Sequence, residues 1–114
     1  MNAPLKIAHA AQDSDPNEPG FVHAVALAAQ SGAKLTSVHA CAAGAPPVDL
    51  PHARTLLSRW GLAEDRAPHE RVQHSCCDSV DETLLDALAR IEPDLLIAST
   101  HARSGLARVL FGSV

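Results

Sequence analysis

Strand-like and helix-like segments alternate along the chain, and this order constrains the fold more than any other feature. Four short segments rich in apolar or β-branched residues are expected as strands, at residues 5–11, 34–41, 72–77 and 94–99. Apolar residues recur at helical spacing in three segments between them, at residues 18–31, 50–62 and 80–91. Parallel neighbouring strands need crossover connections, which are usually helices. The sequence therefore predicts an α/β fold, an open parallel sheet with helices on both faces.

The third helical segment has the clearest start and end. Ser79 and Glu82 have the spacing of a capping box, and Pro93 follows where the helix should stop. Its apolar stripe is expected to consist of Val80, Leu84, Ala87, Leu88 and Ile91. The apolar run at residues 94–99 then indicates a central strand covered on both faces. The strand at residues 72–77 is predicted from its place between two helices more than from its own pattern.

The two earlier helices are predicted from their apolar residues and from the glycine that follows the first. Gly32 stands where a helix C-cap is expected. The buried side of the first helix is predicted to contain Phe21, Ala24, Val25, Leu27 and Ala28. The buried side of the second is predicted to contain Leu56, Leu57 and Trp60. The segment EDRAPHE after the second helix is expected to be a loop.

Charge and composition exclude several classes of function. Nine basic and thirteen acidic residues give a formal net charge of -4, and no stretch concentrates Lys and Arg. Nucleic acid is therefore not an expected partner. The sequence shows no signal-type or transmembrane-length apolar run, so we expect a cytoplasmic protein without membrane attachment.

The cysteines and histidines predict neither a disulfide framework nor a metal site. Cys41, Cys76 and Cys77 are odd in number and two are adjacent, which fits a reducing compartment. His69 and His74 lie near the adjacent pair, but their spacing matches no standard zinc pattern. His39, at the end of the second strand, is interpreted as a buried histidine hydrogen-bonded to the backbone.

The segment DLLIASTHARSGLARVLFGSV, at residues 94–114, resembles the hallmark segment of the universal stress proteins. The likeness extends over nearly the whole chain, through KIAHAAQDSD, HAVALAAQSGAKLTSVHA and CDSVDETLLDAL. It implies a single domain over residues 1–114 with a Rossmann-like, adenine-nucleotide hydrolase-like fold and strand order 3-2-1-4(-5). Family members continue into a further helix and strand, so we expect the domain to be truncated at its C-terminus.

The resemblance also implies where a nucleotide would bind. Nucleotide-binding members carry Gly-x2-Gly-x9-Gly-Ser/Thr, and here Ser99 and Ala102 replace the first two glycines while Gly112 and Ser113 match the end. Gln12 stands where those members carry an Asp, and Asp13 adds negative charge beside it. Small residues let backbone amides approach phosphate closely, so these changes should weaken phosphate binding. The implied site for ATP or AMP comprises Gln12, Ala40, Ser99, Ala102, Arg103, Gly112, Ser113 and Val114.

Three functional hypotheses follow from the residues and the resemblance. The first is a non-catalytic stress-response domain that acts through homodimerisation and protein partners, with weakened or lost nucleotide binding. The alternative is an ATP- or AMP-binding regulatory switch of the same family. An ATP-hydrolysing or adenylating enzyme is the third, but the sequence offers no identifiable base, nucleophile or metal carboxylate pair, so we expect no catalytic residues. If the chain is complete, the apolar fourth strand would be an exposed edge, which favours pairing between copies.

Overall fold

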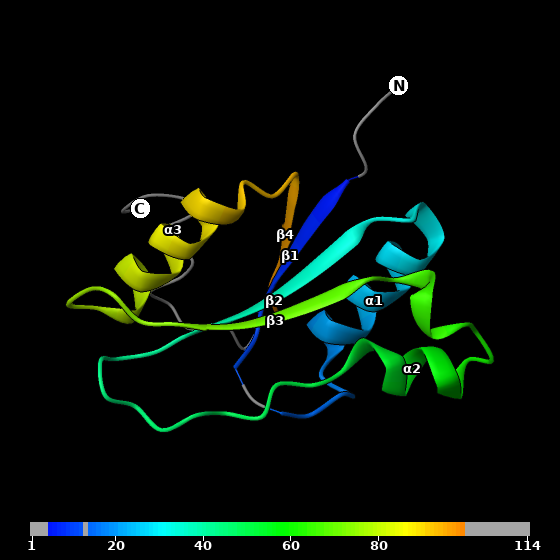
Figure 1. Ribbon diagram of the computed structural model, residues 1–114, viewed down its shortest axis with the longest axis horizontal. Coiled ribbons are helices and arrows are strands. Elements are labelled where there is room, and N and C mark those ends of the chain that lie inside the picture. The colour runs from blue at the N-terminus through cyan, green and yellow to red at the C-terminus, as the bar shows by residue number, and fades with distance from the viewer. Residues whose placement is uncertain (1–4, 13, 100–114) are drawn as a thin grey trace.

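The computed structural model describes residues 5–12 and 14–99 of the chain. Within them, a four-stranded sheet has the order β3-β2-β1-β4, and all three neighbouring pairs are parallel. This is the predicted order (Figure 1). The strands are β1 (Lys6–Ala10), β2 (Lys34–Ala40), β3 (His69–His74) and β4 (Leu95–Ile97). The helices are α1 (Pro19–Ser31), α2 (Ala53–Arg59), α3 (Val80–Ile91) and the short 3-10 helix η1 (Glu64–Arg66).

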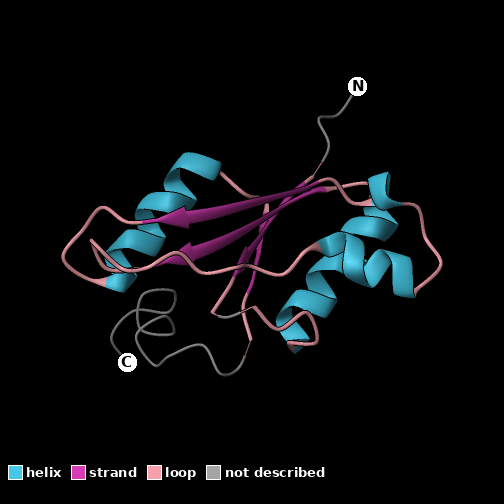
Figure 2. Cartoon of the chain, turned by 60° about the horizontal axis from the view of Figure 1, so that its bottom comes forward, coloured by secondary structure: helices cyan, strands magenta, loops and turns pink. Residues whose placement is uncertain are grey.

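Helices cover both faces of the sheet, as predicted. Figures 1 and 2 show α1 and α2 together on one side of the strands and α3 on the other. Side chains alternate between these faces because successive residues of a strand point in opposite directions. Ile7 and Leu35, which are partners in register, face α1, while Val38 faces α3.

The larger hydrophobic core lies on the α1 and α2 face. Phe21, Leu35 and Leu57 are fully buried there. Gly32 closes α1 in the left-handed conformation with φ of 71°, as its position predicted. On the other face, Leu84 and Ala87 of α3 pack against Val38 in a smaller cluster. The Ser79 hydroxyl caps α3 by accepting from the Glu82 backbone N–H at 3.1 Å, as the capping-box spacing predicted.

Several predicted boundaries and burials were wrong. The third strand runs over His69–His74, three residues before the predicted start and end, because its pairing with β2 sets the register. The second helix covers only Ala53–Arg59, and Trp60 is 38% exposed at its end instead of lying in the core. Leu27 and Val80 are also exposed, because each helix buries a narrower face against the sheet than the apolar residues predicted for it would form. The predicted loop EDRAPHE contains η1 and the first residues of β3.

The position of the fourth strand matches the predicted order 3-2-1-4, although its apolar run taken alone indicated a central strand covered on both faces. Among the described residues, β4 pairs only with β1 and forms one end of the sheet. Leu95 is 43% exposed there.

Two of the three cysteines are bonded to each other, although their spacing predicted no disulfide framework. Cys76 and Cys77 are joined by a disulfide, while Cys41 is a buried free thiol. The bond links adjacent residues and therefore crosslinks no distant parts of the fold. No helix in residues 5–12 and 14–99 is long and apolar enough to span a membrane.

Candidate functional site

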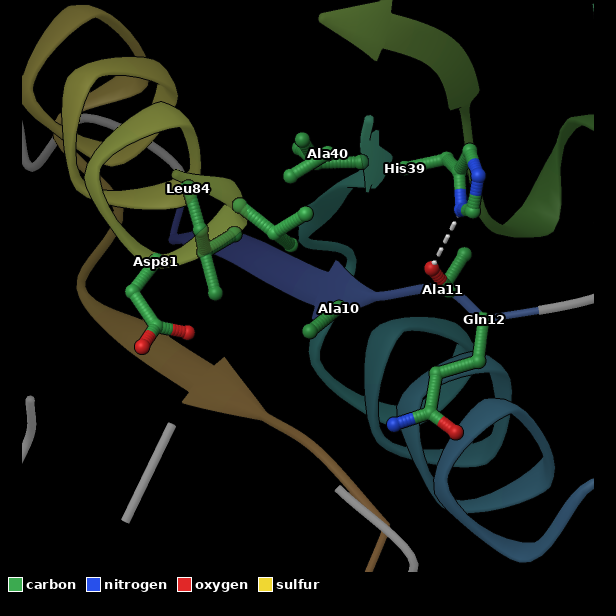
Figure 3. Close-up of a pocket in the computed structure, with 9 residues that line it drawn as sticks. Ala10, Ala11, Gln12, His39, Ala40, Asp81 and Leu84 are labelled. Carbon is green, nitrogen blue, oxygen red and sulfur yellow. Dashed lines mark hydrogen bonds between the residues drawn. The ribbon is translucent and has the colours of Figure 1, made fainter. Parts of the chain in front are cut away.

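A small cleft lies at the carboxyl ends of β1 and β2, where ligands of open α/β sheets bind. Its cavity volume is about 80 Å³. Figure 3 shows Gln12 and Asp81 on opposite sides of Ala10, with Leu84 between the helix and the strands. The lining residues are Ala10, Ala11, Gln12, Val38, His39, Ala40, Val80, Asp81 and Leu84. The cleft is therefore formed by two strand ends and the first turns of α3.

Backbone hydrogen bonds hold the two strand ends that form the floor of the cleft. The Ala11 backbone N–H donates to the Val38 carbonyl at 2.8 Å, which continues the pairing of β1 with β2. His39 Nδ1 donates to the Ala11 carbonyl at 3.0 Å (Figure 3). The predicted hydrogen bond of His39 to the backbone is confirmed, although its side chain is only half-buried. Small alanine side chains at these strand ends leave the space that the cleft occupies.

The Asp81 carboxylate disfavours phosphate at its side of the cleft. Asp81 and Gln12 provide its polar walls, and the residues that line it in the described part of the chain include no Lys or Arg. A carboxylate repels a phosphate group, whereas it accepts hydrogen bonds well from hydroxyl or amino groups. This wall therefore suits the nucleoside part of a ligand better than its phosphates.

The structure brings only two of the predicted nucleotide-site residues into this cleft. Gln12 and Ala40 line it. Ser99 lies two residues after β4 and does not line the cleft. The other predicted members, Ala102, Arg103, Gly112, Ser113 and Val114, lie outside the described residues.

Sequence reasoning missed the contribution of α3 to the cleft. Asp81 was not among the predicted site residues, and Leu84 was predicted only as part of the apolar stripe of the helix. The capping signal at Ser79 could have indicated the position, because it places the start of α3 after a parallel strand. Helices in such folds begin near the carboxyl edge of the sheet, where clefts form.

A network of buried and partly buried polar side chains runs across the α1 and α2 face of the sheet. His9 Nε2 lies 3.1 Å from Glu18 Oε2, and His9 Nδ1 lies 3.2 Å from Ser37 Oγ. Ser37 Oγ in turn lies 2.8 Å from His69 Nε2, and the Ala53 backbone N–H donates to His69 Nδ1 at 3.1 Å. These hydrogen bonds thus link the starts of α1 and α2 across three strands, β1, β2 and β3.

The groups at the two ends of this network, the Ala53 backbone N–H and the Glu18 carboxylate, set the direction of its hydrogen bonds. A backbone N–H can only donate, so His69 Nδ1 accepts and its Nε2 proton is directed to Ser37. At the other end an ionised carboxylate can only accept, so we assign donation from His9 Nε2 to Glu18. The Ser37 hydroxyl then donates to His9 Nδ1, and each buried polar atom has a partner. Ser37 is fully buried, so this hydrogen-bond network fixes the positions of α1 and α2 and does not expose a nucleophile.

The pKa values at the two ends agree with this assignment. Burial lowers the pKa of His69 to about 4, with further lowering by the nearby charge of Arg71, so the ring is neutral near pH 7. Burial alone would raise the pKa of Glu18, but hydrogen bonds from the Gly20 and Phe21 backbone N–H groups outweigh it and lower the pKa. Those two N–H groups lie at the start of α1, so Glu18 also caps this helix.

These features define an open-sheet α/β domain of the Rossmann-like type, with a cleft at the carboxyl edge of its parallel strands. The model of the universal stress protein family matches residues 5–114. The chain belongs to the universal stress protein family.

Solved structures of this family share the fold. A protein from Burkholderia pseudomallei is 22% identical with a TM-score of 0.58, and the match covers 92% of this chain and 87% of that one. A universal stress protein solved in complex with cAMP is 19% identical with a TM-score of 0.61, covering 99% and 88%. One from Archaeoglobus fulgidus is 17% identical with a TM-score of 0.59, covering 96% and 92%. Among curated proteins, none matches the chain.

Proposed function

We propose that this chain is a non-catalytic, cytoplasmic universal stress protein domain that acts by pairing with a second copy and with protein partners, and that its nucleotide binding is weakened. The observation that carries the proposal is the contrast between the two ends of the sheet. The proposal follows from what each end strand presents to solvent.

The β3 end is protected against pairing, whereas the β4 end is apolar. Charged side chains are a common protection of edge strands. At the β3 end, Glu70 and Arg71 are both exposed, and Glu70 pairs with Lys34 at 3.1 Å. At the β4 end, Leu95 is 43% exposed and no charged residue lies within Leu95–Ile97. Among the described residues, β4 is thus the end of the sheet that favours association.

A groove beside β4 extends the same apolar surface. It lies between α1 and β4, and His23, Ala26, Leu27, Gln30 and Ile97 line it. Its volume is about 420 Å³, and Leu27 is 38% exposed. Contiguous apolar surface of this kind is typical of interaction sites. A second copy that presents its own β4 and α1 would cover both surfaces under a twofold axis.

A charge substitution on β4 tests the pairing. We expect the wild-type protein to sediment as a dimer and Leu95→Lys to sediment as a monomer. Leu85→Lys is the matched control, because Leu85 is equally exposed, at 46%, but lies on α3. A wild-type monomer at all concentrations, or a Leu95→Lys dimer as stable as the control, would contradict the proposal.

The second candidate function is an adenine-nucleotide switch. Two observations favour it: the cleft lies at the carboxyl edge of the sheet, and a structural relative was solved in complex with cAMP. Gln12 and Asp81 can hydrogen-bond to ribose or base groups, even though Asp81 disfavours phosphate.

Native mass spectrometry of the purified protein and thermal shifts with ATP and AMP separate the two functions. Weakened binding predicts no co-purified nucleotide and no shift in Tm with either ligand. A switch predicts one nucleotide per chain and a ligand-dependent shift that Gly112→Asp abolishes. Stoichiometric nucleotide in the purified protein would therefore contradict weakened nucleotide binding and support the adenine-nucleotide switch.

A further inference from the structure

Three potential metal-binding side chains converge on the α3 face, outside the cleft. His74 ends β3, Cys76 lies in the connection to α3, and Asp86 lies within α3. One nitrogen, one sulfur and one carboxylate oxygen from these residues all lie within 4.8 Å of one another. His74 Nε2 is already 2.7 Å from Asp86 Oδ2, and Arg90 Nε donates to the same oxygen at 2.9 Å. The part of the chain that the structure describes contains one such group.

The chemistry of this donor set favours zinc. Zn²⁺ binds thiolate, imidazole and carboxylate, and three protein ligands with a fourth open position are a common arrangement. Calcium and magnesium require oxygen ligands, so a set with sulfur and nitrogen does not suit them. A Cys76 thiolate and the Asp86 carboxylate would balance the two charges of the ion, with His74 as a neutral ligand.

The distances require only small side-chain movements. Bonds of about 2.0 to 2.3 Å at tetrahedral angles place ligand atoms about 3.3 to 3.8 Å apart. The widest separation, 4.8 Å, must therefore close by about 1 Å. Cys76 is exposed and Asp86 is only partly buried, so both side chains have room to move. Arg90 can keep its hydrogen bond to the carboxylate from outside the coordination shell.

The Cys76–Cys77 disulfide controls whether the sulfur ligand exists. A disulfide sulfur carries no thiolate charge and is a poor zinc ligand. A cellular dithiol can reduce the bond: one thiolate attacks a cysteine sulfur, the other cysteine leaves and takes up a proton, and the second thiol of the reductant completes the exchange. Two electrons pass from the dithiol, which becomes a disulfide, to the two cysteines, which become thiols. Zn²⁺ then displaces the proton of the Cys76 thiol.

We propose that His74, Cys76 and Asp86 form a zinc site that becomes available when the Cys76–Cys77 disulfide is reduced. The spacing of histidines and cysteines along the sequence predicted no metal site here, because the third ligand, the Asp86 carboxylate, lies on α3. Tertiary structure places Asp86 beside His74.

Cobalt is the probe, because Co²⁺ bound to thiolate gives a sulfur-to-metal charge-transfer band in the near ultraviolet. We expect the oxidised protein to show no band and the protein reduced with a phosphine to show one. Added Zn²⁺ should then displace Co²⁺ and abolish the band. Cys76→Ser and Cys77→Ser form the decisive pair. Both variants remove the disulfide and both retain Cys41, but only Cys77→Ser keeps the Cys76 sulfur that would bind the metal. Cys77→Ser should therefore show the Co²⁺ band without a reductant, whereas Cys76→Ser should show no band.

Asp86→Asn should weaken Zn²⁺ affinity by at least about 100-fold in the reduced protein. Glu82→Gln, one turn earlier on the same helix, is the control and should leave the affinity unchanged. Circular dichroism of each variant reports whether it folds. The proposal is overturned if both cysteine variants behave alike, if the oxidised protein binds as tightly as the reduced one, or if Asp86→Asn binds like Glu82→Gln.

Discussion

Lowering the pH should destabilise this domain through His69. The folded protein holds His69 with a pKa of about 4, against an ordinary value of 6.5, because burial disfavours the charged ring. Between these two values the unfolded chain binds a proton at this position that the folded chain does not bind. The free energy of unfolding must therefore fall as the pH falls from 6.5 to about 4, whereas above pH 6.5 the full contribution is present.

The size of the effect follows from the pKa difference. A difference of about 2.5 units corresponds to about 3 kcal/mol, at about 1.4 kcal/mol per unit. His69 also lines an open cleft with His52 and Arg71, and solvent in that cleft reduces the effect. We therefore expect a loss of about 2 kcal/mol of stability from this residue between pH 6.5 and pH 4.

Urea unfolding of the wild type and of His69→Gln at a series of pH values measures this contribution. The Gln side chain can retain one hydrogen bond of the buried polar network, and it does not titrate. Other carboxylates and histidines titrate in both proteins and cancel in the difference. We expect the wild type to be the more stable protein at pH 7 and its advantage to shrink by about 2 kcal/mol by pH 4. A difference that is constant across this range would refute the assignment of a neutral, buried His69.

Two further substitutions test the packing. Gly20→Ala should destabilise the protein by about 1 kcal/mol, measured by urea unfolding. A Cβ at this position would lie 3.0 Å from Glu18 Oε1 and 3.1 Å from the Ser99 backbone nitrogen. An unchanged or increased stability would show that the start of α1 can move. Leu57→Ala should cost about 2 to 5 kcal/mol because Leu57 is fully buried in the larger core, whereas the control Leu85→Ala, at 46% exposure, should cost less than about 1 kcal/mol. Equal losses from the two leucine variants would contradict the position of the core.

The sequence alone determined the fold class and the order of the elements. Short apolar runs separated by helical patterns leave few arrangements other than a parallel sheet with crossover helices, because the connections are too long for hairpins. Local signals also determined two helix ends, since Ser79 and Gly32 act through hydrogen bonds and backbone angles within a few residues. The position of His39 beside a backbone carbonyl followed in the same way from its place at a strand end.

Tertiary structure decided what depends on contacts between distant residues. The register of β3 is set by its pairing with β2, so the sequence pattern misplaced that strand by three residues. Glu18, His9, Ser37 and His69 form one hydrogen-bonded chain only because three strands and two helices bring them together. The meeting of Asp81 with Gln12 at the cleft, and of Asp86 with His74 and Cys76, depends on how α3 packs on the sheet. Sequence spacing carries no information about such pairs, because their separation along the chain is unrelated to their separation in space.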